Sequence, residues 1–470
     1  MKPKNTFYIT TPIYYTNAAP HIGSAYTTIA ADVLARWNRL KGKEVFFLTG
    51  TDEHGKKIQE TAEKSGKSPK EFVDSIVSEF KEAWKILNIS NDNFIRTTDK
   101  YHEKEVQKIL QELYEKNLIY KGIYESYYCT ACEQYLTKNE LVDGCCPIHK
   151  TKVELKKEEA YLFRLSKFQD KILKAIKSEK FLILPVKRKN EMISFIESGL
   201  QDISISRKKS EVFWGIELPF DKNHTCYVWI DAFWNYISGL KTNENKKKFW
   251  PADIQLMAND ILRVHATIWP ALLLALDYEL PKKMFIHGFF TINGQKMSKS
   301  LGNVIDPVYL SNRYGTDSLR YYMLRAIPFG EDGDVSEKAL ASRHNNELAD
   351  KLGNLVSRVS GLIEKNGTKK TPNKLIKNLR EKEIEKLMEA CQLDKALNEI
   401  FAFIDVCNEY VQSKKPWETK DKKVLYELKE SILKIAELLN PFVPETSEKI
   451  TKCFTSKSIK KSDILFKKIQ

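Results

Sequence analysis

Long apolar runs are missing from this sequence of 470 residues. No uninterrupted stretch approaches the roughly 18 to 20 apolar residues that a membrane-spanning helix requires. The N-terminal segment MKPKNTFYIT also lacks the apolar core of a secretory signal, and it leads almost at once into a strand-like segment. We therefore expect no membrane span and no secretory or transit segment, and we expect the protein to be cytoplasmic.

Cysteine is scarce as well. The chain has 8 cysteines, too few for a disulfide scaffold of this size. Half of them are crowded into residues 129–146. This clustering favours a metal site over disulfides.

Acidic residues are outnumbered by basic ones, 62 Asp+Glu against 76 Lys+Arg, which gives a formal net charge of +14. Such a charge is compatible with a nucleic-acid partner but does not establish one. The hydrophobic content of 42% and the charged content of 29% are ordinary for a soluble globular protein. Length alone predicts roughly two to four domains.

The N-terminal residues predict a β–α–β unit. NTFYITTPIYY is rich in strand-forming residues, and KEVFFLTGTDEHG reads as a second strand. The segment between them places Ile29, Val33 and Trp37 four apart, as a helix does. Gly23 and Ser24 then lie at a helix N-terminus, where backbone N–H groups and the helix dipole favour an anion. His21 could help to hold a phosphate there, or it could merely cap a loop.

The rest of the chain predicts an α/β region followed by a helical one. Helical patterns occupy 68–87 and 100–117, and after a Cys-rich interruption strand patterns at 224–233, 253–260 and 282–292 surround an apolar helix at 261–276. Long helical patterns dominate from about residue 335 onward. We expect a Rossmann-type α/β domain with a parallel sheet, split by an insertion. The expected boundaries are 1–118 and 223–300 for its two halves, 119–222 for the insertion, 301–345 for a linker and 346–470 for an all-helical domain.

The cysteine-rich segment has the spacing of a zinc knuckle. Cys129 and Cys132 form C-x2-C, and Cys146 and His149 form C-x2-H. Together they supply four ligands for a tetrahedral, closed and therefore structural Zn²⁺. Cys145 adjoins Cys146, so the ligand choice stays open, although Cys146 reproduces the two-residue gap of the first pair. The alternative is a set of unrelated core thiols.

A second basic motif, GQKMSKSLGN at 294–303, directly follows the last strand pattern. Its two lysines, Lys296 and Lys299, flank Met-Ser on a glycine-containing loop. Such a loop could close over a triphosphate and stabilise charge that develops on a transferring group.

An ordered series of motifs resembles that of class I aminoacyl-tRNA synthetases, and among these the methionyl-tRNA synthetase family. The series is TPIYYTNAAPHIGSAYTT, FLTGTDEHG, the zinc knuckle, YVWIDA, KMSKSLGN, DSLRYYMLR, LGNLVSR and KKPWE. The resemblance implies that the helical domain binds the anticodon and that the linker contacts the tRNA stem. It implies methionine activation by ATP with Mg²⁺, release of pyrophosphate and transfer of methionine to tRNA(Met). We expect a monomer, because the chain ends soon after LLNPFVPETSEKI.

The same resemblance implies an ATP site with His21, Lys296 and Lys299 as catalytic residues. Its members would be His21, Gly23, Ser24, Asp260, Lys296, Ser298 and Lys299. Four positions depart from the family pattern: Ser24 replaces a second histidine, Ala258-Asn259 replaces Gly-Lys before Asp260, and Val264 replaces an aromatic residue. The Ser24 change leaves open a catalytically impaired, synthetase-like tRNA-binding protein.

Methionine would be held by Asp52, which pairs with the ammonium, and by residues that line the side-chain pocket: Ile13, Tyr15, Trp229, Ala232, Tyr236, Ile261, His265 and Trp269. Aromatic walls suit a polarizable thioether, although such residues at helical spacing also form ordinary cores. Another class I synthetase, such as the cysteinyl, leucyl, isoleucyl or valyl enzyme, is the remaining alternative.

Three residues of the helical domain match positions that read the anticodon. They are Asn354, Arg358 and Trp417. Asn and Arg can hydrogen-bond base edges, and Trp417 can stack on an unpaired base. Trp417 could instead be a packing anchor after Pro416.

Overall fold

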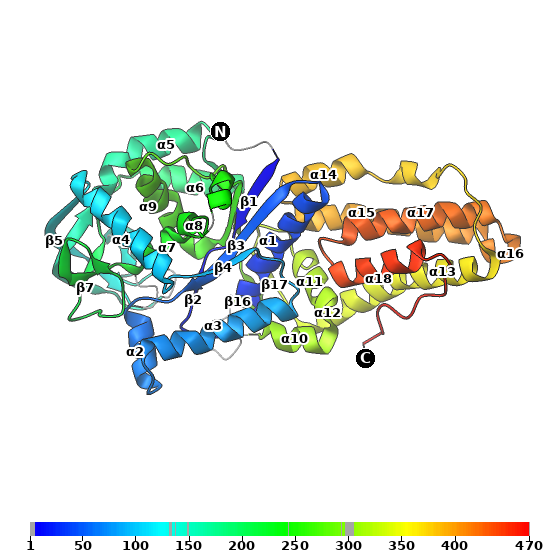
Figure 1. Cartoon of the computed structure of the whole chain (residues 1–470), viewed down its shortest axis with the longest axis horizontal. Coiled ribbons are helices and arrows are strands. Elements are labelled where there is room, and N and C mark those ends of the chain that lie inside the picture. The colour runs from blue at the N-terminus through cyan, green and yellow to red at the C-terminus, as the bar shows by residue number, and fades with distance from the viewer. Residues whose placement is uncertain are drawn as a thin grey trace. The chain divides into compact units, whose positions relative to one another are not determined.

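The structure is a computed structural model, and it describes residues 5–130, 134–136, 138–147, 150–242, 244–292, 294–296 and 305–469. The chain forms two compact units. Unit 1 comprises Met1–Ala19, Lys43–Lys81 and Asn91–Ile286, and unit 2 comprises Pro20–Gly42, Glu82–Ser90 and His287–Gln470. Figure 1 gives the positions of the elements along the chain.

Unit 1 is built on a seven-stranded sheet in the order β2-β3-β1-β13-β14-β8, with β4 also paired to β3. The strands are β1 (Thr6–Thr10), β2 (Tyr14–Tyr15), β3 (Glu44–Asp52), β4 (Asn93–Arg96), β8 (Leu182–Leu184), β13 (Ile254–Ala258) and β14 (Lys283–His287). β3 pairs in parallel with β1, β2 and β4, and β1 pairs in parallel with β13. All of β1 is buried, as expected for a parallel strand covered on both faces. The predicted α/β fold with a parallel sheet is confirmed.

Helices pack around this sheet and complete the core of unit 1. They include α2 (Lys56–Lys64), α3 (Pro69–Ile86, which belongs to unit 2 from Glu82 onward), α4 (Lys100–Glu115), α5 (Gln169–Lys177), α6 (Val186–Glu197) and α9 (Leu262–Ala275). The apolar faces of α4, α5, α6 and α9 share one buried cluster, in which α9 contacts both α5 and α6. α9 is apolar nearly all round, and eleven of its residues are buried, which is the pattern of a core helix.

An antiparallel sheet interrupts the parallel pattern of unit 1. β5 (Ile119–Cys129) pairs with β7 (Glu154–Phe163) along almost its whole length, and β6 (Gln134–Leu136) and β9 (Ile203–Ser204) flank them. A smaller sheet follows, formed by β10 (Ser206–Lys208), β11 (Glu217–Leu218) and β12 (Asp221–Cys226). Between β7 and β9 in the sequence, β8 returns to the parallel sheet and pairs with β14.

The strand predicted over residues 224–233 is wrong in its second half. β12 ends at Cys226, and α7 (Val228–Phe233) and α8 (Asn235–Ser238) follow. Aromatic and β-branched residues favour a strand by propensity. In α7, however, Val228, Ile230, Asp231, Ala232 and Phe233 are all buried. A short helix buried on most sides has no polar stripe, so its period cannot be read from the sequence.

Unit 2 combines the long helix α1 (Ile22–Leu40) with a C-terminal set of helices. It also contains a small sheet of β15 (Phe290–Ile292), β16 (Gln295–Lys296) and β17 (Gly333–Asp334). The helices are α10 (Pro307–Tyr314), α11 (Thr316–Arg325), α12 (Glu337–Arg343), α13 (Asn354–Asn366), α14 (Glu381–Glu389), α15 (Leu393–Lys414), α16 (Pro416–Thr419), α17 (Lys422–Leu439) and α18 (Pro444–Thr455), with a π-helical stretch at His344–Gly353. The predicted helical C-terminal domain is confirmed.

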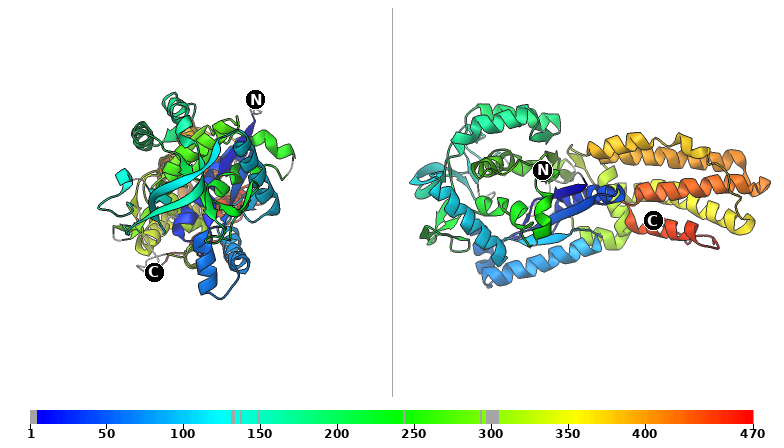
Figure 2. Two further views of the ribbon diagram at one scale, coloured as in Figure 1. Left: turned by 90° about the vertical axis from the view of Figure 1, so that its left-hand side faces the viewer. Right: turned by 45° about the horizontal axis from the view of Figure 1, so that its top comes forward.

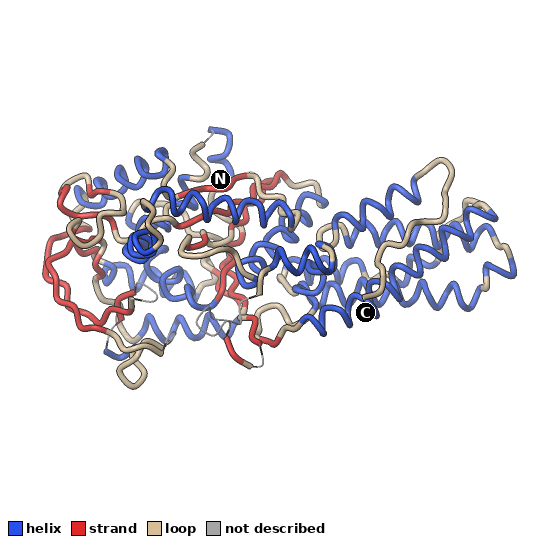
Figure 3. The backbone as a smooth tube through the Cα atoms, turned by 90° about the horizontal axis from the view of Figure 1, so that it is seen from below, coloured by secondary structure: helices blue, strands red, loops and turns tan. Residues whose placement is uncertain are grey.

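The helices of this C-terminal set run alongside one another. α17 contacts α13, α15 and α18, and Figure 2 shows α13, α15 and α17 side by side. Figure 3 shows the same part of the chain as helices joined by loops. In the described part of the chain, no helix has both the length and the apolar character that crossing a membrane requires.

Candidate active site

The start of α1 is organised by His21, the residue that precedes its first turn. His21 is extended (φ −129°, ψ 172°), and its Nδ1 accepts a hydrogen bond from the Gly23 N–H at 3.0 Å. The Ser24 hydroxyl accepts from the His21 N–H at 3.0 Å and donates to the His21 carbonyl at 2.7 Å. This reciprocal capping box fixes the imidazole over the first turn. Ser24 therefore has a structural role that the sequence did not indicate.

Gly23 is required by this arrangement. A Cβ at position 23 would lie 2.9 Å from Cε1 and 3.0 Å from Nδ1 of His21. Real Cβ atoms do not approach other atoms so closely, so any larger residue would displace the imidazole. The glycine keeps both the ring and the first N–H groups of α1 in place.

The KMSKS segment (296–300) belongs to unit 2, and residues on both sides of it are held by hydrogen bonds. Lys296 ends β16, where it pairs with Thr291 of β15. Between these two strands, the Gly294 N–H donates to the Asp334 carboxylate at 2.9 and 3.1 Å. After the segment, the Ile305 carbonyl accepts from the Ile22 N–H at 3.0 Å. The exit of the loop is thus hydrogen-bonded to the first turn of α1. The side chain of Lys296, and all of Ser298 and Lys299, lie outside the described residues.

α1 is anchored inside unit 2 by a buried ion pair. Arg320 of α11 is fully buried, and its Nη2 lies 2.7 Å from Oδ2 of Asp32. Burial alone would raise the pKa of Asp32, but Arg320 and Arg36 outweigh it and hold that pKa below its usual value. The same guanidinium donates to the carbonyls of Pro441 and Phe442. One side chain therefore ties α1 to the C-terminal helices.

In unit 1, Asp52 and Tyr15 are neighbours at the carboxyl end of β3. The two residues are paired in register across β2 and β3. The N–H and the hydroxyl of Thr16 both donate to the Asp52 carbonyl at 3.0 Å. Ligands of open α/β sheets bind at this edge, so Asp52 and Tyr15 are well placed for one.

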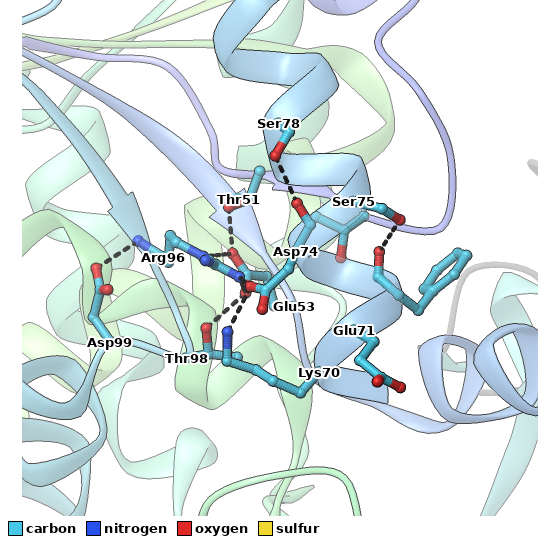
Figure 4. Close-up of polar contacts among 12 residues, drawn as sticks. Thr51, Glu53, Lys70, Glu71, Asp74, Ser75, Ser78, Arg96, Thr98 and Asp99 are labelled. Atoms are coloured by element: carbon cyan, nitrogen blue, oxygen red, sulfur yellow. Dashed lines mark hydrogen bonds and ion pairs between the residues drawn. The ribbon is translucent and has the colours of Figure 1, made fainter. Parts of the chain in front are cut away.

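The residue after Asp52 belongs to a buried polar network that the sequence did not reveal. Arg96 donates through Nε and Nη2 to the two carboxylate oxygens of Glu53, at 2.8 and 2.7 Å. The hydroxyls of Thr51 and Thr98 each donate to the same carboxylate at 2.6 Å. Figure 4 shows Arg96 between Glu53 and Asp74. Both oxygens of Glu53 are satisfied, which holds the end of β3 rigidly.

His265 is a buried and neutral histidine. Its Nδ1 lies 2.9 Å from the Ile261 carbonyl, which can only accept, so Nδ1 carries the proton. Its Nε2 then accepts from the Tyr236 hydroxyl at 2.9 Å. Burial lowers the pKa of His265 to about 4. The ring therefore contributes a dipole but no charge at neutral pH.

Aromatic rings surround this histidine. Phe233 lies 5.0 Å from it and Trp229 6.2 Å, centroid to centroid. Trp269 stacks on Phe233 at 5.7 Å, and its Nε1 donates to Gln255 at 3.1 Å. The structure thus brings together Trp229, Tyr236, Ile261, His265 and Trp269.

Two further predicted pocket residues, and Asp260 of the predicted ATP site, lie in different surroundings. Ala232 is buried in α7, next to this group in sequence. Ile13 packs instead against a separate buried cluster that includes Tyr8, Phe46 and Leu48. Asp260 is half-buried in a short 3-10 turn, Asn259–Ile261, just before α9.

Two of the predicted zinc ligands lie together. Cys129, at the end of β5, and Cys146 are both 1% exposed and share a small cluster with Leu136. Thr151 lies against both, with its hydroxyl 3.8 Å from the Cys129 sulfur and its carbonyl accepting from the Cys146 N–H. Cys145 is half-buried and forms backbone bridges to Val142 and Lys152. Cys132 and His149 lie outside the described residues, and the described ones contain no group of three or more potential ligands.

The predicted anticodon residues are all exposed in unit 2. Asn354 begins α13 and Arg358 lies four residues later, on the same face. Trp417 in α16 is 41% exposed, whereas its neighbour Pro416 is buried. Pro416 therefore packs at this corner, while Trp417 is partly open to solvent.

Comparison with known proteins adds family information to this geometry. The family model "tRNA synthetases class I (M)" matches residues 7–152 and 137–360, and "Anticodon-binding domain of tRNA ligase" matches 377–468. The methionine–tRNA ligase of Caldanaerobacter subterraneus subsp. tengcongensis is 49% identical over 95% of this chain and 73% of its own. That of Clostridium tetani is 48% identical over the same shares.

The fold agrees with these relatives. A Mycobacterium tuberculosis methionyl-tRNA synthetase solved in complex with methionyl-adenylate superposes with a TM-score of 0.91 at 36% identity, over 96% of this chain and 94% of that one. Sequence and structure thus agree over nearly the whole length. The chain belongs to the methionine–tRNA ligases, the methionyl-specific family of the class I tRNA synthetases.

Proposed function

We propose that the chain activates methionine with ATP, releasing pyrophosphate, and then transfers the methionyl group from the adenylate to the 3′ end of tRNA(Met), for both initiation and elongation. The observation that carries this proposal is the match over nearly the full length to a synthetase that holds methionyl-adenylate. Such a match shares the whole scaffold on which both steps take place.

ATP, as its Mg²⁺ complex, is bound by His21, Gly23 and Ser24 at the start of α1, by Asp260, and by the KMSKS residues Lys296, Ser298 and Lys299. Support comes from the capping box at His21 and from the hydrogen bond that joins Ile305 to Ile22. A helix N-terminus and two lysines supply positive potential where charge develops on the α-phosphate and the departing pyrophosphate. His21, Lys296 and Lys299 are the proposed catalytic residues.

Methionine is held through Asp52, which pairs with its ammonium group. The thioether lies among Ile13, Tyr15, Trp229, Ala232, Tyr236, Ile261, His265 and Trp269. The neutral state of His265 supports this assignment. The methionine side chain is uncharged and cannot compensate a buried charge, so an uncharged pocket suits it. The aromatic rings around His265 offer the polarizable surface that sulfur favours.

A structural Zn²⁺ is bound by Cys129, Cys132, Cys146 and His149, within the insertion at 119–222 that divides the catalytic halves 1–118 and 223–300. The burial of Cys129 and Cys146 in one cluster supports this site. Zinc there would cross-link a segment with little apolar core of its own.

The linker is 301–345, and the anticodon domain, 346–470, reads tRNA(Met) through Asn354, Arg358 and Trp417. We further propose a cytoplasmic monomer.

Charging of tRNA(Met) tests the complete function and separates it from the alternative of a catalytically impaired tRNA-binding protein. The purified protein is given ATP, methionine and a tRNA(Met) transcript, and methionyl-tRNA is measured. We expect multiple turnovers. A protein that binds the transcript but forms neither adenylate nor methionyl-tRNA would contradict the proposal.

A further inference from the structure

Unit 1 contains a second buried polar cluster, formed by His54, His102, Asp231 and Ser238. The Nδ1 atom of His54 lies 2.7 Å from Oδ2 of Asp231, and Nε2 of His102 lies 2.7 Å from Oδ1. The other ring nitrogen of His102 lies 2.7 Å from the Ser238 hydroxyl. All four residues are buried. One carboxylate thus binds two histidines, one through each of its oxygens.

The charges of the cluster fix the direction of its hydrogen bonds. Burial alone would raise the pKa of Asp231, but His54 and His102 lower it, so the carboxylate stays ionised. An ionised carboxylate only accepts, and each facing ring nitrogen must therefore donate. Burial likewise opposes charge on His54, while Asp231 raises the pKa of that ring above its usual value. The two hydrogen bonds to Asp231 therefore have a fixed direction, from each ring to the carboxylate.

The members of this cluster come from the elements that carry the proposed methionine site. His54 follows Asp52 by two residues, beyond the end of β3. Asp231 lies in α7 between Trp229 and Ala232, and Ser238 ends α8 two residues after Tyr236. His102, in α4, joins Asp231 to Ser238 and so joins α7 to α8. The cluster therefore connects the ammonium side of the site to its aromatic side.

We propose that Asp231 and His102 are positioning residues for methionine, which set the spacing between Asp52 and the aromatic wall without contacting substrate. This inference rests on the methionine site proposed above. Two contacts hold the end of β3: the hydrogen bonds from Arg96 to Glu53, and the hydrogen bond from His54 to Asp231. Loss of the Asp231 charge should let α7 move relative to Asp52. Small displacements of a binding group can change rates and affinities by about 10- to 100-fold.

Substitutions at His102 separate the two contacts of its ring. In His102→Gln the amide nitrogen occupies nearly the place of Nε2 and keeps the contact with Asp231. In His102→Asn the amide occupies nearly the place of Nδ1 and keeps only the contact with Ser238. If Asp231 is the positioning residue, the Gln variant should retain methionine affinity and the Asn variant should lose it. A merely structural role predicts no such difference between two variants of similar stability.

The test measures ATP–pyrophosphate exchange with methionine and ATP varied separately, together with Tm. Asp231→Asn and His102→Asn should raise KM for methionine by about 10- to 100-fold, with KM for ATP unchanged and His102→Gln close to wild type. His344→Asn is the matched control, because His344 is also buried and bonded to a serine, Ser318 at 2.8 Å, but belongs to unit 2. It should lower Tm and leave KM for methionine unchanged.

Asp52→Asn distinguishes failure of the inference from failure of the proposed site. If Asp52→Asn raises KM for methionine while Asp231→Asn and His102→Asn do not, the positioning role is overturned and the site stands. If Asp52→Asn has no effect on KM for methionine, the proposed site and the positioning role both fail. Parallel rises in KM for methionine and for ATP would also overturn the inference. Should Asp231→Asn fail to fold, the two His102 variants decide the question.

Discussion

Gly23 shows how one missing side chain prepares a binding site. Its backbone donates to the His21 ring, and the space where a Cβ would stand is already filled by that ring. Position 23 is inside a helix, where alanine is intrinsically favoured over glycine by about 1 kcal/mol. The glycine at this position therefore makes room for the imidazole at the expense of helix stability.

Gly23→Ala should accordingly separate activity from stability. We expect it to slow adenylate formation by about 10- to 100-fold, because the imidazole is displaced, while Tm stays near that of the wild type. Single-turnover activation and thermal melting measure the two effects. The control is Gly361→Ala in α13, where the new Cβ would meet only the Lys461 side chain at 3.5 Å. That variant should keep full activity, and equal activation rates for the two variants would refute the role given to Gly23.

His265 predicts a specific pH dependence of stability. Its folded pKa is about 4, below the unfolded value near 6.5. Between these values the unfolded chain binds a proton that the folded chain excludes, so stability falls as pH drops from about 6.5 to about 4 and loses nothing further from this group below that. In His265→Gln this component is absent, and the Gln carbonyl can still accept from Tyr236. Unfolding in denaturant at several pH values should give a flatter profile for the variant, whereas parallel profiles would contradict a buried neutral histidine.

At the scale of elements, the sequence predicted what depends on period and motif. The strand of β1, the helices α1, α3 and α4, and the apolar α9 all carry clear patterns. α7 was missed, because a helix buried on most sides lacks the polar stripe that reveals a helical period. The candidate site also divides into residues with a motif and residues without one. The motif predicted Asp52 as a site residue, whereas the partners of Glu53 and Asp231 come from distant segments. Arg96 and His102 lie in elements without any motif, and only the folded chain brings them to these carboxylates.

The segment 129–149, which carries the proposed zinc ligands, allows a paired test. Cys146 is buried beside Cys129, while Cys145 is half-buried and points its backbone into bridges with Val142 and Lys152. Freshly purified protein should contain one zinc per chain. Cys146→Ser should lose the metal and Cys145→Ser should keep it, as measured by elemental analysis. The reverse result would exchange the ligand assignment, and wild-type protein without zinc would refute the site.

At the scale of the whole molecule, we predict that transfer to tRNA depends on the helical region, whereas methionine activation does not. Trp417 lies in the helical region of unit 2 and is exposed. Trp417→Ala should weaken charging of tRNA(Met) by the equivalent of one base–aromatic stack, on the order of 1–3 kcal/mol, and leave methionine activation unchanged. The loss should be smaller for a tRNA whose CAU anticodon has been altered, because that contact is already gone. Equal losses in activation and transfer, with a lower Tm, would identify Trp417 as a packing residue instead.

The central claim is that the site selects methionine. It is tested most directly by ATP–pyrophosphate exchange with each standard amino acid in turn, using the wild-type protein at one fixed ATP concentration. The neutral His265, the aromatic rings around it and the carboxylate of Asp52 predict exchange that depends on methionine and on no other standard amino acid. Stronger exchange with cysteine or leucine, or none with methionine, would contradict the account.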